Sequence, residues 1–120
     1  MGLGLQPHVA NLDFETIRDG SFAVVVPRGE LDLSGAALLE AEFDRLAEDA
    51  ELQGVVLDMR GLRFMDSSGL RLVILTDMRW REAGRRFSLV RGPDTVHRVF
   101  EITQMSQRLE FVATPEEGGA

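Results

Sequence analysis

The sequence of 120 residues predicts a single α/β domain built on a mixed sheet of four to five strands. Short runs rich in β-branched residues alternate with longer segments that have a helical period, which is the pattern of an α/β fold. The apolar content of 44% is ordinary for one packed core. Between the two ends of the chain no linker, repeat or low-complexity tract divides it, so we expect one domain.

The first half of the chain predicts two strands and a helix. Residues 8–17 have a weak strand pattern, and residues 22–26 form a stronger, valine-rich strand after a turn at Asp19-Gly20-Ser21. Pro27 predicts that this second strand ends or lies near a sheet edge, because proline cannot donate a ladder hydrogen bond. Ser34 is predicted to cap a helix that runs to about Ala50, with one apolar face formed by Leu39, Phe43, Leu46 and Ala50.

The second half alternates strands and helices. Residues 55–57 are apolar without alternation, which is typical of a strand buried on both faces. A helix is predicted from about Ser68 to Ala83, and Gly84 suits the C′ position that follows it. Strands at 86–90 and 109–112 flank a short helix that opens at Gly92-Pro93-Asp94. The resulting order, β-β-α-β-α-β-α-β, predicts parallel strands with an antiparallel opening pair.

The domain is expected to span residues 8–113, between flexible termini at 1–7 and 114–120. Residues 1–6 lack the features of a signal peptide, and residues 114–120 are a polar tail that we do not expect to pack. No apolar run is long enough to cross a bilayer, so no membrane partner is expected. The chain has no cysteine, and a cytoplasmic location is the simplest expectation.

The charge of the chain limits its partners. The formal net charge is −7, and every one of the thirteen basic residues is an arginine. Direct nucleic-acid binding is not expected, because neutralising phosphates requires a cationic surface. The cluster of Arg79, Arg81, Arg85 and Arg86 is interpreted as a helix end, where cations suit the helix dipole.

Two enzyme-like or ligand-binding alternatives find little support. A serine nucleophile needs a base, yet the two histidines are His8, near the N-terminus, and His97, which we interpret as an exposed residue of the late helix. The Gly-x-Ser-x-Gly elbow is absent, and no phosphate-binding loop with lysine is present. The sequence therefore predicts a protein that is not an enzyme and that uses no cofactor and no metal ion.

The most informative segment is Asp66-Ser67-Ser68-Gly69, which follows an apolar strand and opens a helix. Asp and Ser are good N-cap residues, so simple capping explains the tetrapeptide taken alone. Its surroundings add more: Leu57-Asp58 and Phe64-Met65 precede it, and Leu70 follows it.

This segment resembles the central motif of the STAS-domain anti-sigma factor antagonists. The resemblance extends to Gly29-Glu30-Leu31-Asp32, which is similar to a turn after that family's second strand, and to residues 93–102, which are similar to its late helix. About residues 8–113 agree in element order. The resemblance implies a single STAS-like domain with helices packed on one face of the mixed sheet.

The resemblance also implies a function. Members of the family bind an anti-sigma factor that is also a serine kinase, and this frees a sigma factor. The kinase phosphorylates the first serine of the motif, here Ser67, and phosphorylation blocks binding; a PP2C-type phosphatase reverses it. The partner-binding surface is expected to comprise Glu30, Asp32, Asp66, Ser68, Gly69 and Arg71.

The sequence is compatible with more than one role for the arginines near the motif and for the domain as a whole. Arg71 stands where many family members carry a small residue, so it is a candidate determinant of partner choice, and Arg60 and Arg63 are candidates to pair with the phosphate or with a partner's acidic patch. The alternative is that all three are solvated surface. A second alternative is a constitutive STAS scaffold or transport-complex subunit without phosphorylation. A monomer or weak dimer is expected.

Overall fold

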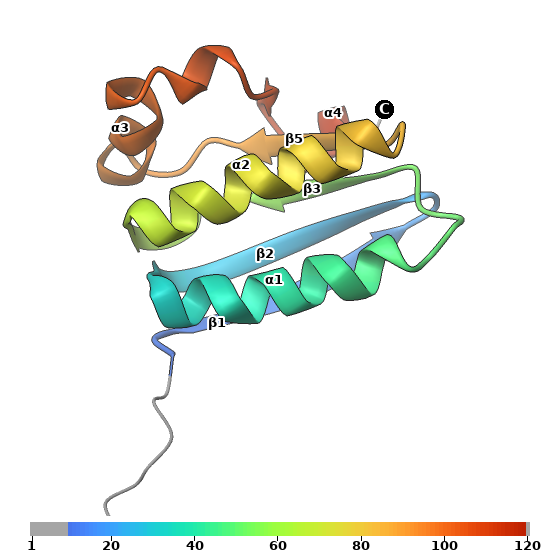
Figure 1. The fold of residues 1–120 in the computed structure, drawn as a ribbon, viewed down its shortest axis with the longest axis horizontal. Coiled ribbons are helices and arrows are strands. Elements are labelled where there is room, and N and C mark those ends of the chain that lie inside the picture. Colours follow the sequence, from blue (N-terminus) through green and yellow to red (C-terminus); the bar gives the residue numbers. More distant parts are fainter. Residues whose placement is uncertain (1–9, 120) are drawn as a thin grey trace, which may run out of the picture.

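A computed structural model describes residues 10–119, and the expected leader at 1–7 lies outside them. Within this range one mixed sheet of six strands has the order β1-β2-β3-β5-β6, and β4 also pairs with β2. The predicted α/β class is confirmed (Figure 1). The elements in chain order are β1 (Leu12–Asp19), β2 (Phe22–Leu31), α1 (Leu33–Ala47), β3 (Gly54–Asp58), β4 (Gly61–Met65), α2 (Ser67–Glu82), β5 (Arg86–Val90), α3 (Asp94–Ile102), a 3-10 turn (Met105–Gln107), β6 (Phe111–Val112) and α4 (Pro115–Gly118).

The strand directions follow the predicted scheme. β1 and β2 form an antiparallel hairpin, and β2–β3, β2–β4, β3–β5 and β5–β6 are parallel pairs. β3 is buried at all five positions, as its unbroken apolar run predicts. Helices α1 and α2 lie side by side over one face of the sheet, and the core between these layers includes an edge-to-face contact of Phe43 with Phe87.

Pro27 does not end β2 and does not place it at an edge. β2 continues to Leu31 and pairs with strands on both sides. Its parallel pairing with β3 stops at Val25, and its pairing with β4 begins at Arg28. Pro27 therefore falls in the gap between two ladders, where its missing N–H removes no parallel bond.

Strand β4 is an element that the sequence did not predict. Residues 61–65 carry no strand pattern in the sequence, yet they pair with the second half of β2. Their burial does not alternate, since Leu62 and Met65 are buried while Arg63 and Phe64 are exposed. Without an alternating pattern the strand gave no period-2 signal.

The predicted helix boundaries need two corrections. The first helix, α1, ends at Ala47, so the exposed Ala50 lies outside it and not on its apolar face, and its N-cap is a different residue from the one predicted. Asp32, not Ser34, caps α1: its side chain accepts from the Gly35 N–H at 2.9 Å. The end of α2 was predicted correctly, because Gly84 has φ +73° and the Arg85 N–H donates to the Trp80 carbonyl, which is a Schellman-type termination.

The C-terminal segment packs instead of forming a loose polar tail. Residues 115–118 form α4, which Thr114 and Glu117 close with a capping box. Gly118 is buried against Val56 and Ser88. Figure 1 shows α4 on the face of the sheet opposite α1 and α2. The expectation that helices cover one face holds for α1 and α2 but not for α4.

Candidate functional site

The predicted switch residue lies at the start of α2. Ser67 is the first residue of this helix, and its side chain is exposed. Asp66 is the N-cap: its Oδ1 accepts from the Ser68 N–H at 2.9 Å and from the Gly69 N–H at 3.3 Å. The capping interpretation of this motif is therefore right for Asp66, and it leaves the Ser67 hydroxyl on the surface.

The start of α1 repeats this arrangement beside it. Asp32 caps α1 with nearly the same extended backbone as Asp66, with φ −99° and ψ −166° against φ −110° and ψ −169°. The two helix starts are neighbours because β2 and β4 are parallel with Leu31 opposite Met65, and because the Asp66 N–H donates to the Leu31 carbonyl at 3.3 Å. The sequence carries a signal for this pair, Asp32-Leu33-Ser34-Gly35 against Asp66-Ser67-Ser68-Gly69, which the sequence reasoning missed.

Gly69 belongs to the packing and not to the surface. It is buried, and a Cβ at this position would lie 2.8 Å from the Leu31 carbonyl oxygen and 3.0 Å from Cγ of Met65. Glycine thus lets the first turn of α2 approach β2 closely. Gly69 therefore positions the first turn of α2, and with it Ser67, against β2.

Of the other predicted residues, Glu30 lies in β2, and Ser68 and Arg71 lie on α2 with Ser67. Glu30 is half-buried at the end of β2 and pairs with the exposed Arg63 at 3.5 Å. Ser68 and Arg71 line a shallow groove between α1 and α2. Ser67 and Arg71 together line a second hollow, whose other walls are Leu70, Ile74 and Leu75.

Two exposed apolar side chains were missed as candidates for this surface. Leu33, which follows the Asp32 cap, is 74% exposed, and Phe64 on β4 is 47% exposed. Exposed large apolar residues beside polar ones are typical of protein contact surfaces. Their exposure had no sequence signal, because it depends on how the two helix starts sit against the sheet.

Arg60 is not part of this surface. Its guanidinium makes two bonds to the Asp58 carboxylate, at 2.9 and 2.7 Å, and both residues line a hollow with α4 on the opposite face of the sheet. The side-chain hydrogen bond from Asp58 raises the pKa of Arg60 further above its ordinary value. Of the two arginines before the motif, Arg63 alone lies near the pair of helix starts.

His97 is buried, contrary to the sequence interpretation. It is 6% exposed and contacts Phe111 edge-to-face, with ring centroids 5.1 Å apart. Burial is the main cause that lowers the pKa of His97, with a further contribution from Arg91. The helical period of α3 places His97 on a different face from Val96 and Phe100, and this face was expected to be exposed. After α3 the chain turns, and Phe111 of β6 covers His97.

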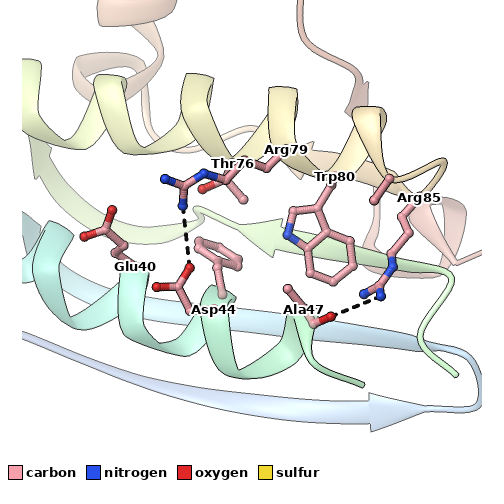
Figure 2. Close-up of a pocket in the computed structure, with 9 residues that line it drawn as sticks. Glu40, Asp44, Ala47, Thr76, Arg79, Trp80 and Arg85 are labelled. Carbon is pink, nitrogen blue, oxygen red and sulfur yellow. Dashed lines mark hydrogen bonds and ion pairs between the residues drawn. The ribbon is translucent and has the colours of Figure 1, made fainter. Parts of the chain in front are cut away.

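A separate pocket of about 90 Å³ lies farther along the same two helices. Figure 2 shows Arg79 reaching Asp44, at 3.5 Å, and Arg85 donating to the Ala47 carbonyl, at 3.0 Å. The Arg85 guanidinium also lies 5.0 Å from the centroid of the Trp80 ring. These interactions join the ends of α1 and α2 and involve none of the predicted site residues.

The arginine cluster at this helix end is therefore engaged within the protein. Arg81 pairs with Asp77 at 2.8 Å, and Arg86 pairs with Glu110.

Among residues 10–119, no helix is long and apolar enough to span a bilayer. In the same range, no group of three or more acidic or histidine side chains is placed to hold a metal ion.

The comparisons with known proteins agree with this fold. The family described as "Mlab, STAS domain" matches residues 15–113. An anti-sigma-B factor antagonist of Staphylococcus aureus is 28% identical over 93 residues, covering 78% of this chain and 85% of the relative. An anti-sigma F factor antagonist of Paenibacillus polymyxa is 25% identical over 93 residues, covering 78% of this chain and 80% of the relative.

Solved structures are similar across almost the same length. The crystal structure of an anti-sigma factor antagonist from Mycobacterium paratuberculosis has a TM-score of 0.79 at 20% identity, covering 89% of this chain and 90% of that one. This similarity shows a shared fold. With a family match across most of the chain, the protein belongs to the STAS-domain family.

Proposed function

We propose that this protein is an anti-sigma factor antagonist controlled by phosphorylation of Ser67. In its unphosphorylated form it binds an anti-sigma factor that is also a serine kinase, which frees a sigma factor. Phosphorylation of Ser67 blocks this binding, and a PP2C-type phosphatase restores it. The proposal gives the protein a binding role without catalysis, cofactor, membrane or direct nucleic-acid contact, as a monomer or weak dimer in the cytoplasm.

One observation carries the proposal: the Ser67 hydroxyl is exposed between two helix caps that do not use it. Asp66 and Asp32 bind the free N–H groups of the first turns, so the fold does not depend on the Ser67 side chain. Both relatives named above are antagonists of anti-sigma factors, which supports the same class of partner here. The exposed Leu33 and Phe64 supply apolar contact area at this place.

The chemistry of the switch follows from this exposure. The Ser67 oxygen attacks the γ-phosphorus of the kinase's ATP, ADP leaves, and the hydroxyl proton passes to a base of the kinase. The product carries roughly −1.5 to −2 charge at neutral pH. Against a partner carboxylate about 5 Å away, with an effective dielectric of about 20, each charge pair costs roughly 3 kcal/mol. That is about a hundredfold loss of affinity.

The fold should tolerate the same phosphate. An anion at a helix N-terminus is stabilised by roughly 0.3–1 kcal/mol, and Ser67 is exposed, so no packing is lost. The phosphate therefore acts on the interface and not on the fold.

The first test measures binding to a recombinant anti-sigma factor with kinase activity from the same genome, by isothermal titration calorimetry. We expect Ser67→Ala to bind and to resist phosphorylation. Ser67→Asp and the kinase-treated protein should bind at least tenfold more weakly, with unchanged circular dichroism. Ser68→Ala is the matched control and should still accept phosphate at Ser67. Equal affinity of the phosphorylated and unmodified proteins would contradict the switch and favour a constitutive binding role without phosphorylation.

A further inference from the structure

Arg71 is the cation nearest in sequence to Ser67 on α2, and it is not engaged. Within residues 10–119 it takes part in no hydrogen bond, ion pair or ring contact, whereas Arg63 and Arg79, the arginines on either side of it in sequence, pair with Glu30 and Asp44. Arg71 is exposed, so its guanidinium can bind a charged group without disturbing the core.

The helix geometry directs Arg71 toward Ser67. The two residues are four apart on α2, which places their Cβ atoms about 5–6 Å from each other. Side chains on a helix slant toward its N-terminus, so the long Arg71 side chain extends back over the first turn. In agreement with this, Ser67 and Arg71 line the same surface hollow.

Two backbone donors of the first turn, the N–H groups of Ser68 and Gly69, already donate to Asp66. A phosphate on Ser67 can use these two donors only by displacing Asp66, so further donors would strengthen its binding. Arg71 offers a planar guanidinium that matches phosphate oxygens, in the favourable order of acid before base at a spacing of four.

We propose that Arg71 is the intramolecular partner of phosphorylated Ser67. The proposal rests on the phosphorylation proposed above and adds a second component to the switch. In the unmodified protein Arg71 is available to an acidic group of the anti-sigma factor. After phosphorylation Arg71 is held over the phosphate, so the surface gains an anion and loses a cation at once. Arg71 is thus a positioning residue that sets how strongly the modification acts.

The test uses the full chain with phosphoserine placed at position 67 during translation, so that no kinase or partner is needed. Phosphorus NMR then follows the second ionisation of the phosphate as pH is varied. We expect its pKa to be lower in the wild-type chain than in Arg71→Gln, by about 0.3 unit or more. The difference should shrink at about 1 M salt, and Arg71→Lys should retain part of it.

Arg98→Gln is the matched control for the change in net charge. Arg98 is an exposed arginine on α3 that has no ion pair or hydrogen bond within the described range. The Arg98→Gln substitution should leave the pKa of the phosphate close to the wild-type value. Equal pKa values in the wild-type chain and in Arg71→Gln would overturn the proposal. That outcome is independent of partner binding, whereas failure of the proposed function would appear as unchanged affinity of the phosphoserine protein for its partner.

Discussion

At the scale of single residues, the site depends on two aspartates that have the same structural task. Asp32 and Asp66 each turn from an extended backbone into a helix, and each accepts from N–H groups of the first turn. A substitution of either residue to test partner binding therefore changes stability as well. Asp32→Asn and Asp66→Asn are the appropriate tests of charge, because asparagine caps helices about as well as aspartate.

Asp66→Ala should lower the free energy of unfolding by roughly 1 kcal/mol, because the Ser68 and Gly69 N–H groups lose their acceptor. This corresponds to a fall in melting temperature of about 4 °C. Asp66→Asn should stay close to the wild type. Denaturation can be followed by the fluorescence of Trp80, the single tryptophan of the chain, which is 3% exposed. Equal losses in both variants would mean that charge, and not the cap, is what stabilises the helix.

At the scale of elements, α4 shows how a short polar segment can become part of the fold. It has four residues and little apolar area, yet it covers Val56 and Ser88 on the reverse face of the sheet. Its capping box closes the segment locally, and the lack of a side chain at Gly118 lets it approach β3 and β5.

Gly118→Val should destabilise the protein by roughly 1–3 kcal/mol, because the new Cβ would lie 2.4 Å from a methyl group of Val56 and 2.6 Å from the Ser88 oxygen. Gly119→Ala is a matched control, since its nearest neighbour would be 3.7 Å away. Urea denaturation of both variants measures their free energies of unfolding. If Gly118→Val were as stable as Gly119→Ala, α4 would not be packed as described.

At the scale of the whole molecule, the site exists because parallel pairing brings distant segments to one edge. The parallel register of β2 and β4 brings the end of β2, with Glu30 and Asp32, next to the start of α2, with Asp66 and Ser67. More than thirty residues separate these two segments in sequence. Tertiary packing also buries His97, whose ring contacts Phe100 of its own helix and Phe111 of β6.

The burial of His97 predicts a pH dependence of stability. Its pKa is lowered in the folded state, so the folded chain keeps it neutral while the unfolded chain takes up a proton below about pH 6.5. Stability present above about pH 6.5 is therefore lost as pH falls through the folded pKa of His97. Glu101 and Asp94 partly oppose this shift.

His97→Phe keeps an aromatic ring and removes the titration, so its free energy of unfolding should change less between pH 7 and about pH 5.5 than that of the wild type. Denaturant titrations at several pH values measure this difference. The stability that Glu42 and Glu110 contribute is lost only at lower pH. Arg45 and Arg86 lower the pKa of these two carboxyl groups below their ordinary value near 4.5. If the free energies of unfolding of the wild type and of His97→Phe changed equally between pH 7 and about pH 5.5, His97 would not control stability in this pH range.

Local patterns determined much of this protein. The unbroken apolar run of β3, the apolar period of α1 and the glycine after α2 each predicted an element, because strand burial, helix period and backbone conformation are written in neighbouring residues. The Asp-Ser-Ser-Gly motif likewise placed Ser67 at a helix start. These features require no knowledge of distant contacts.

Tertiary structure alone decided the rest. The pairing of β4 with β2, the burial of His97 and the packing of α4 all depend on contacts between segments far apart in the chain. A sequence pattern reports which face of an element is apolar, but not which other segment returns to cover its polar face. For that reason the sequence by itself placed Ser67 at the start of a helix, and only the folded chain shows that the exposed Leu33 lies at the neighbouring helix start.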